Sequence, residues 1–163
     1  MKSLLIVYHS MTGGTLQMAQ AATVGARTEL ALQVSLRRAQ DTHATDLIAA
    51  SGYIFATPEN LGSMSGQMKD FFDRTYYAAL DQLDGRPYAA IICAGSDGRN
   101  AAHQVERVAT GWRLKRMADS LIACTHAQTR EEILRPKIIP KLVLQQCEAL
   151  GATLASGIAM GIF

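Results

Sequence analysis

The chain of 163 residues carries little charge and no long hydrophobic segment. Charged residues make up 18% of it, the longest apolar runs span about seven residues, and the net charge is only +2. A membrane-spanning helix needs roughly 20 apolar residues, and a nucleic-acid-binding domain usually carries a strong basic surplus. We therefore expect neither a membrane nor a nucleic-acid partner. The first apolar run is also too short for a secretion signal, so a cytoplasmic location is expected.

Metal-binding and disulfide patterns are missing as well. The cysteines Cys93, Cys124 and Cys147 form no C-x-x-C pair, and the four histidines show no metal-ligand spacing. We interpret the cysteines as small core side chains rather than redox or nucleophilic thiols, because free cysteine is often buried. No metal site is expected. With 48% hydrophobic residues, a chain of this length can bury a core without staples, and we expect one domain spanning residues 1–163.

The chain does contain a regular alternation of strand-like and helix-like segments. Continuous apolar runs are typical of strands covered on both faces, and strict alternation in Leu30–Leu36 predicts an edge strand. The other predicted strands are Leu4–Tyr8, Gly52–Thr57, Tyr88–Gly95 and Leu121–Ala127, and the predicted helices are Thr15–Ala26, Asp46–Ala50 capped by Thr45, Gly66–Leu80 with an aromatic core-facing stripe, Ala101–Met117 and one opened by Pro140. Five strands separated by helices indicate an α/β fold with a doubly wound parallel sheet. Residues 128–139 are irregular and charged, which predicts an exposed excursion.

The loop after the first predicted strand has the composition of an anion site without a cation. Ser10, Thr12 and Thr15 supply hydroxyl donors, and Gly13 and Gly14 let the backbone approach a ligand closely. A helix N-terminus at the carboxyl end of a parallel strand favours phosphate. Without a lysine the loop is no P-loop, its adjacent glycines exclude G-x-G-x-x-G, and it lacks the acidic residues of a phosphoryl-accepting receiver and the cysteine of a thiol phosphatase. We expect a phosphate group held by neutral donors.

Two stretches resemble a known family. Ser10–Thr15 fits the pattern Ser/Thr-x-Thr-Gly-x-Thr, which resembles the phosphate loop of flavodoxin-like FMN proteins. Thr57–Asp73 is similar to a segment of NAD(P)H-dependent FMN reductases and of quinone reductases of the tryptophan-repressor-binding-protein type. The resemblance covers roughly residues 3–120. It implies a flavodoxin-like five-stranded sheet with strand order 2-1-3-4-5, FMN as the cofactor and NAD(P)H as the electron donor.

The resemblance also implies which residues hold the cofactor. The first loop would bind the phosphate, while the loop around Pro58–Met64 and the loop at Gly95–Asn100 would flank the flavin ring. The implied cofactor-binding residues are Ser10, Met11, Thr12, Gly13, Gly14, Thr15, Pro58, Glu59, Asn60, Leu61, Gly62, Ser63, Met64, Gly95, Ser96, Asp97 and Gly98. Electron-carrier flavodoxins typically sandwich the ring between aromatic residues, which these loops lack. An open ring face would admit a hydride donor or a quinone.

The function expected from these features is transfer of electrons from NAD(P)H through FMN to a quinone or similar small acceptor. In such an enzyme the cofactor performs the chemistry, and His9 and His103 are candidates for giving a proton to a reduced quinone, with Glu59 and Arg99 as further polar residues at the mouth. Two alternatives stay open: a flavodoxin-type electron carrier to a protein partner, and an interaction module that has lost its flavin. The balanced charge disfavours the carrier, since carriers usually present strong acidic fields. The resemblance to these reductases also implies self-association into a homo-oligomer.

Overall fold

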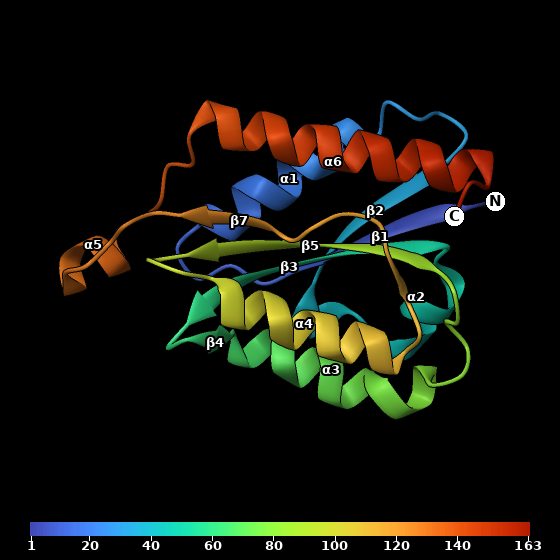
Figure 1. The fold of residues 1–163 in the computed structure, drawn as a ribbon, viewed down its shortest axis with the longest axis horizontal. Helices are drawn as coiled ribbons and strands as arrows, with labels where there is room; N and C mark the ends of the chain where they lie inside the picture. The colour runs from blue at the N-terminus through green and yellow to red at the C-terminus, as the bar shows by residue number, and fades with distance from the viewer.

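A central parallel sheet carries helices on both faces in the computed structural model, which describes residues 1–163 (Figure 1). The elements, in chain order, are β1 (Ser3–Tyr8), α1 (Gly14–Ala26), β2 (Gln33–Arg38), the 3-10 turn η1 (Ala39–Asp41), α2 (Ala44–Ala49), β3 (Gly52–Asn60), β4 (Ser63–Met64), α3 (Gly66–Ala79), β5 (Pro87–Ala94), α4 (Arg99–Gly111), β6 (Lys115–Arg116), β7 (Leu121–Cys124), α5 (Arg130–Leu134) and α6 (Lys141–Met160). None of the helices combines the length and hydropathy that a membrane crossing requires.

The sheet has the order β2-β1-β3-β5, with β6 and β7 both paired to the outer side of β5. β6 pairs with Pro87 and Tyr88 at the start of β5, and β7 pairs with Ile91–Ala94 at its end. The two short strands therefore share the place of one fifth strand, interrupted at residues 117–120. Counted this way, the predicted flavodoxin-like order 2-1-3-4-5 is confirmed. From β1 the chain continues to β2 on one side, and it then crosses to β3 on the other side of β1. This reversal places the ligand-binding crevice of such a sheet at the carboxyl ends of β1 and β3.

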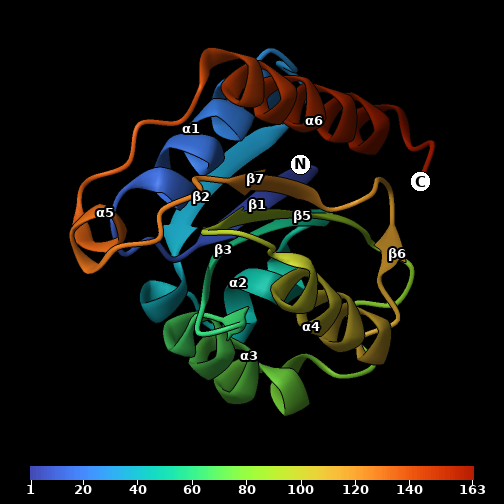
Figure 2. The same ribbon diagram turned by 60° about the vertical axis from the view of Figure 1, so that its left-hand side comes forward.

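Helices α1 and α6 cover one face of the sheet, and α2, α3 and α4 cover the other (Figure 2). Successive residues of β1 alternate between these layers: Leu4 and Ile6 pack toward α1 and α6, whereas Leu5 and Val7 pack toward the opposite helices. β2 pairs with β1 alone and is an edge strand, as its alternation predicts. The continuous apolar runs thus belong to strands that are buried on both faces, as predicted.

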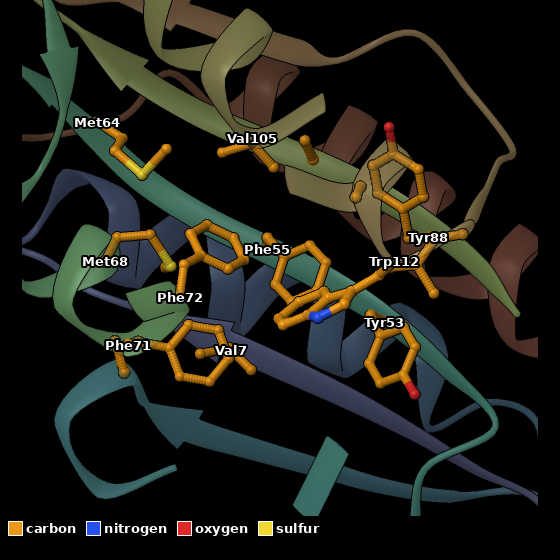
Figure 3. Close-up of a cluster of buried hydrophobic side chains, with 14 of the residues drawn as sticks. Val7, Tyr53, Phe55, Met64, Met68, Phe71, Phe72, Tyr88, Val105 and Trp112 are labelled. Atoms are coloured by element: carbon orange, nitrogen blue, oxygen red, sulfur yellow. The ribbon is translucent and has the colours of Figure 1, made fainter. Parts of the chain in front are cut away.

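The aromatic side chains gather in the layer between the sheet and α3 and α4 (Figure 3). Phe55 of β3 lies at the centre, with the rings of Phe72 and Trp112 at centroid distances of 5.3 and 6.3 Å. Trp112 Nε1 donates to the carbonyl of Tyr76 at 3.0 Å, so its polar atom is satisfied in the core. The aromatic stripe predicted on α3 is therefore confirmed as core packing.

Three predicted boundaries are wrong because a local turn ends the regular pattern, and β3 also runs to Asn60 rather than ending at Thr57. β2 begins at Gln33 rather than Leu30, since the Leu32 N–H donates to the Glu29 carbonyl in a turn that leaves Leu30 exposed. α4 ends at Gly111 rather than Met117. Arg113 adopts φ +56°, a left-handed conformation that is incompatible with a right-handed helix. Its guanidinium pairs with Asp81 and Asp84 at 2.9 and 3.0 Å.

The third wrong boundary is the C-terminal end of the last strand, and one predicted cap is also wrong. β7 ends at Cys124 instead of Ala127, because His126 adopts φ +57°. α2 begins at Ala44 with His43 as its N-cap residue, not Thr45. The carboxylate of Asp46 accepts the His43 N–H at 2.8 Å, which fixes the helix start one turn before the acidic residue.

Candidate functional site

A cavity of about 580 Å³ opens where β1, β3 and β5 end. Residues at the ends of these three strands and in the loops that follow them line the cavity, together with residues of the segment between β7 and α6. In Figure 1 these strand ends point toward the protruding helix α5. The cavity therefore occupies the crevice at which open parallel sheets bind ligands.

The N-terminus of α1 faces this cavity with free backbone donors. Gly13 is its N-cap residue with φ +90°, a left-handed conformation that glycine adopts without strain. A Cβ on Gly14 would lie 2.7 Å from the Cys93 sulfur, so only glycine lets the first turn sit this close to β5. The Gln17 N–H closes the first helical bond on the Gly13 carbonyl at 3.1 Å, which leaves the N–H groups of residues 14–16 without an intrahelical acceptor.

Two hydroxyl groups add donors to this helix end. Ser10 Oγ accepts the Gly13 N–H at 3.1 Å, so its own O–H hydrogen remains available. Thr15 Oγ1 is buried and makes no hydrogen bond, although the thiol of Cys93, a weak partner, lies nearby. An unpartnered buried hydroxyl costs about 1–3 kcal/mol, and an anionic oxygen in the cavity would remove that cost. The residues present therefore fit a phosphate group.

The predicted loop at Pro58–Met64 is a β-hairpin instead of an irregular turn. Asn60 pairs with Ser63 across a two-residue turn in which Leu61 and Gly62 have φ +52° and +72°, the signs of a type I′ turn. Leucine is uncommon in that conformation, and the Leu61 side chain is fully exposed at the rim of the cavity. A strained, exposed apolar residue beside a cavity is the kind of feature that binding sites retain.

The carboxylate of Glu59 binds the N-terminus of α4. Its Oε1 accepts the Gly98 N–H at 2.9 Å and its Oε2 accepts the Ala101 N–H at 3.2 Å. The neighbouring loop is also self-contained, since Arg99 pairs with Asp97 at 2.6 Å and lowers the pKa of that carboxyl. Glu59 thus lines the cavity, but its carboxylate caps the N-terminus of α4.

The structure brings most of the predicted cofactor residues together. Those that line the cavity are Ser10, Met11, Thr12, Gly14, Thr15, Pro58, Glu59, Asn60, Leu61, Gly62, Gly95 and Ser96. Gly13, Ser63, Asp97 and Gly98 lie outside the lining, and the Met64 side chain packs in the aromatic core (Figure 3). Their roles stay predictions.

The two candidate histidines lie elsewhere. His9 lines a separate cleft of about 310 Å³ with Tyr8 and Arg38, and burial lowers its pKa. His103 is exposed on α4 and lines neither space. Neither side chain belongs to the main cavity, and their proposed proton transfer remains untested.

Sequence reasoning missed the wall built by residues 125–139. Thr125, Ala127, Ile133 and Lys137 line the cavity, together with Cys93 and Ala94 at the end of β5. The predicted excursion contains the short helix α5, whose N-cap residue Thr129 exchanges hydrogen bonds with Glu132. Only the irregular, charged composition of this segment set it apart in the sequence, and nothing in that composition indicates contact with a loop more than 100 residues earlier.

Comparison with known proteins agrees with the geometry. Residues 37–128 match the family model described as NADPH-dependent FMN reductase. A NAD(P)H dehydrogenase (quinone) of Acidithiobacillus ferrooxidans is 37% identical over 95 residues, covering 46% of this chain and 48% of that protein. A flavodoxin of Aquifex aeolicus is 31% identical over 98 residues, covering 60% and 53%. The chain spans about half the length of these curated relatives.

Solved structures share the fold over nearly the whole chain. A flavodoxin from the domain Archaea superposes with a TM-score of 0.78 at 22% identity, covering 96% of this chain and 98% of that one. A WrbA-like flavodoxin from Agrobacterium tumefaciens gives 0.74 at 19% identity, with 98% and 99% covered. The family match includes more than half of the chain, although the loop at Ser10–Thr15 precedes it. The chain belongs to the NADPH-dependent FMN reductase family, and it has the flavodoxin-like fold.

Proposed function

We propose that this protein passes electrons from NAD(P)H through FMN to a quinone or a similar small acceptor. The observation that carries the proposal is the open N-terminus of α1, with the buried and unpartnered hydroxyl of Thr15, inside a cavity at the switch point of the sheet. Relatives described as an NAD(P)H dehydrogenase (quinone) and as a flavodoxin support flavin chemistry in this fold.

The phosphate of FMN would bind at α1. The hydroxyl donors are those of Ser10, Thr12 and Thr15. The free N–H groups of the first turn lie at the positive end of the helix dipole, which favours an anion. The backbone of Pro58–Gly62 and of Gly95–Ser96 would flank the ring and orient it. When bound, FMN supplies the hydride and electron chemistry, while the chain binds, orients and shields it.

The lining of the cavity favours a small flat acceptor. No aromatic side chain lines it, so no aromatic ring of the protein would cover a bound flavin. Met11, Leu61 and Ile133 place exposed apolar groups in its lining, suited to a nicotinamide or a quinone ring. Among its ionisable side chains, Glu59 caps α4, the Lys137 ammonium donates to three backbone carbonyls, and burial raises the pKa of the Cys93 thiol. The chain therefore contributes orientation rather than a dedicated acid or base.

An electron carrier to a protein partner is the second candidate, supported by the flavodoxin relative. The two functions differ in whether a nicotinamide reduces the bound flavin. The test is anaerobic addition of NADPH, and separately NADH, to the FMN-loaded protein, followed through flavin absorbance, and then steady-state oxidation with soluble 1,4-benzoquinone.

Rapid bleaching and turnover that requires both protein and FMN is the expected result. Bound flavin that neither nicotinamide reduces would favour the carrier. Folded protein that binds no FMN would overturn both functions.

We also propose that the protein self-associates. Leu134, Ile138 and Leu142 are exposed on three consecutive segments, namely α5, its connection to α6 and the first turn of α6. Isolated exposed apolar residues are ordinary, but several along one stretch are typical of interaction surfaces. Light scattering on the eluted protein is expected to give a multiple of 17.6 kDa, and a monomer at micromolar concentration would contradict this proposal.

A further inference from the structure

Lys137 is the cationic side chain that lines the cavity, and its backbone is hydrogen-bonded to the loop that precedes α1. The Lys137 N–H donates to the Thr12 carbonyl at 2.9 Å. Its Cβ lies 3.4 Å from where a side chain on Gly14 would begin. The four-carbon stem of lysine therefore starts beside the backbone donors of α1, within reach of any anion that they bind.

The ammonium group of Lys137 is held in place without being neutralised. Nζ donates to the carbonyls of Glu132, Ile133 and Arg135 at 2.8, 2.8 and 2.6 Å, and it forms no ion pair. Carbonyls are neutral acceptors, so the positive charge remains uncompensated. Burial raises the pKa of the Cys93 thiol in the cavity lining, and the charge of Lys137 partly offsets this rise.

The side chain of Gln17 fixes this segment against α1. Its Nε2 donates to the carbonyls of Gly13 and Lys137 at 3.0 and 2.7 Å, and its Oε1 accepts the Ile139 N–H at 3.1 Å. One amide thus pairs with the backbone on both sides of residue 138, as a neighbouring strand would. Gln17 is a positioning residue that keeps Lys137 beside the loop.

We propose that Lys137 binds the phosphate of the flavin nucleotide and makes the cavity select FMN over riboflavin. The inference rests on the proposed function and adds to it the cation that the loop itself lacks. A phosphate group is a stronger partner for an ammonium than a carbonyl is, because both groups are charged. The carbonyls of α5 hold the side chain close by until the phosphate arrives, and the flexible stem then turns toward it.

The experiment compares the dissociation constants of FMN and riboflavin for Lys137→Met by fluorescence titration at low and high salt. We expect FMN affinity to fall about tenfold, as for the loss of one charged hydrogen bond. Riboflavin affinity should not change, and the salt dependence of FMN binding should weaken. Lys137→Arg should restore most of the preference for FMN. Lys141→Met, an exposed lysine outside the cavity, is the matched control.

Each other outcome has a distinct meaning. An equal loss of FMN and riboflavin affinity would show that Lys137 only caps α5, which overturns the inference. FMN affinity unchanged in Lys137→Met would overturn it as well, while leaving the proposed function intact. Wild-type protein that binds neither flavin would overturn the proposed function and this inference together.

Discussion

Helices α1 and α4 begin at the same edge of the sheet with nearly the same backbone. Each spans 13 residues, each has a glycine N-cap in the left-handed region, with φ +90° at Gly13 and +84° at Gly98, and neither has an acidic residue in its first turn. Their side-chain partners differ. At α4 the Glu59 carboxylate accepts two N–H groups, whereas at α1 only the Ser10 hydroxyl accepts one.

This difference teaches what makes a helix N-terminus an anion site. Both ends carry the same partial positive charge and orphan donors. At α4 the protein supplies an anion itself, because the Glu59 carboxylate accepts the Gly98 and Ala101 N–H groups. At α1 the donors and the buried hydroxyl of Thr15 stay unsatisfied, which reserves this end for an external anion.

The largest expected effect comes from giving the N-terminus of α1 its own carboxylate, which would remove its difference from α4. Ser10→Asp should satisfy the donors internally and repel a phosphate, because two anions would compete for one helix end. FMN affinity should fall by about 100-fold or more, with thermal stability of the flavin-free protein no lower than wild type. Titration and melting curves measure both quantities. Ser10→Asn, of similar shape and uncharged, is the control, and a similar loss in that variant would attribute the effect to shape rather than charge.

Removing the hydroxyl donors of α1 should have the next largest effect. Thr12→Val combined with Thr15→Val is expected to weaken FMN binding by roughly tenfold or more, since the loss of even one bond to a charged group costs about 1.5 kcal/mol or more. Thr15→Val alone should stabilise the flavin-free protein by about 1 kcal/mol, because it removes an unpartnered buried hydroxyl. Urea unfolding without flavin measures that gain. Unchanged FMN affinity in the double variant would contradict the phosphate assignment.

The opposite change, opening α4, should lower stability moderately. Glu59→Gln keeps one neutral oxygen as an acceptor and replaces the other with an NH2 group, so one of the Gly98 and Ala101 N–H groups loses its partner. We expect the free energy of unfolding to fall by about 1 kcal/mol in urea titrations, in the range of lost helix caps. Glu148→Gln, at an exposed position on α6, should change it little. Equal effects of the two substitutions would mean that the capping bonds add nothing.

The smallest expected effect concerns His9, which precedes the loop of α1. Burial lowers its pKa below the ordinary value of 6.5, and its Nδ1 has no partner. The unfolded chain therefore binds a proton more readily than the folded protein, so stability falls as pH drops through 6.5 toward the folded pKa. His9→Gln should reduce the fall in melting temperature between pH 7 and pH 5. An identical pH profile in both proteins would remove His9 as a cause.

Local patterns predicted much of the fold. Apolar runs and alternation placed each of the five strand positions, and the aromatic stripe of α3 marked its buried face. The left-handed turns at Arg113 and His126 escaped prediction, because neither position holds a glycine. The hairpin at Leu61 escaped for the same reason at its first turn position. Sequence patterns report the average preference of a residue, and tertiary contacts override it at single positions.

By itself, the sequence determined the strand and helix segments and the loop with hydroxyls and glycines at the end of β1, because both depend on neighbours within a few residues. Only the tertiary structure decided which helix end stays open and where the cation lies. Glu59 reaches Gly98 across 39 positions, and Gln17 reaches Lys137 across 120. Such pairings depend on which strands become neighbours in space, and no periodicity within one segment encodes a partner that distant.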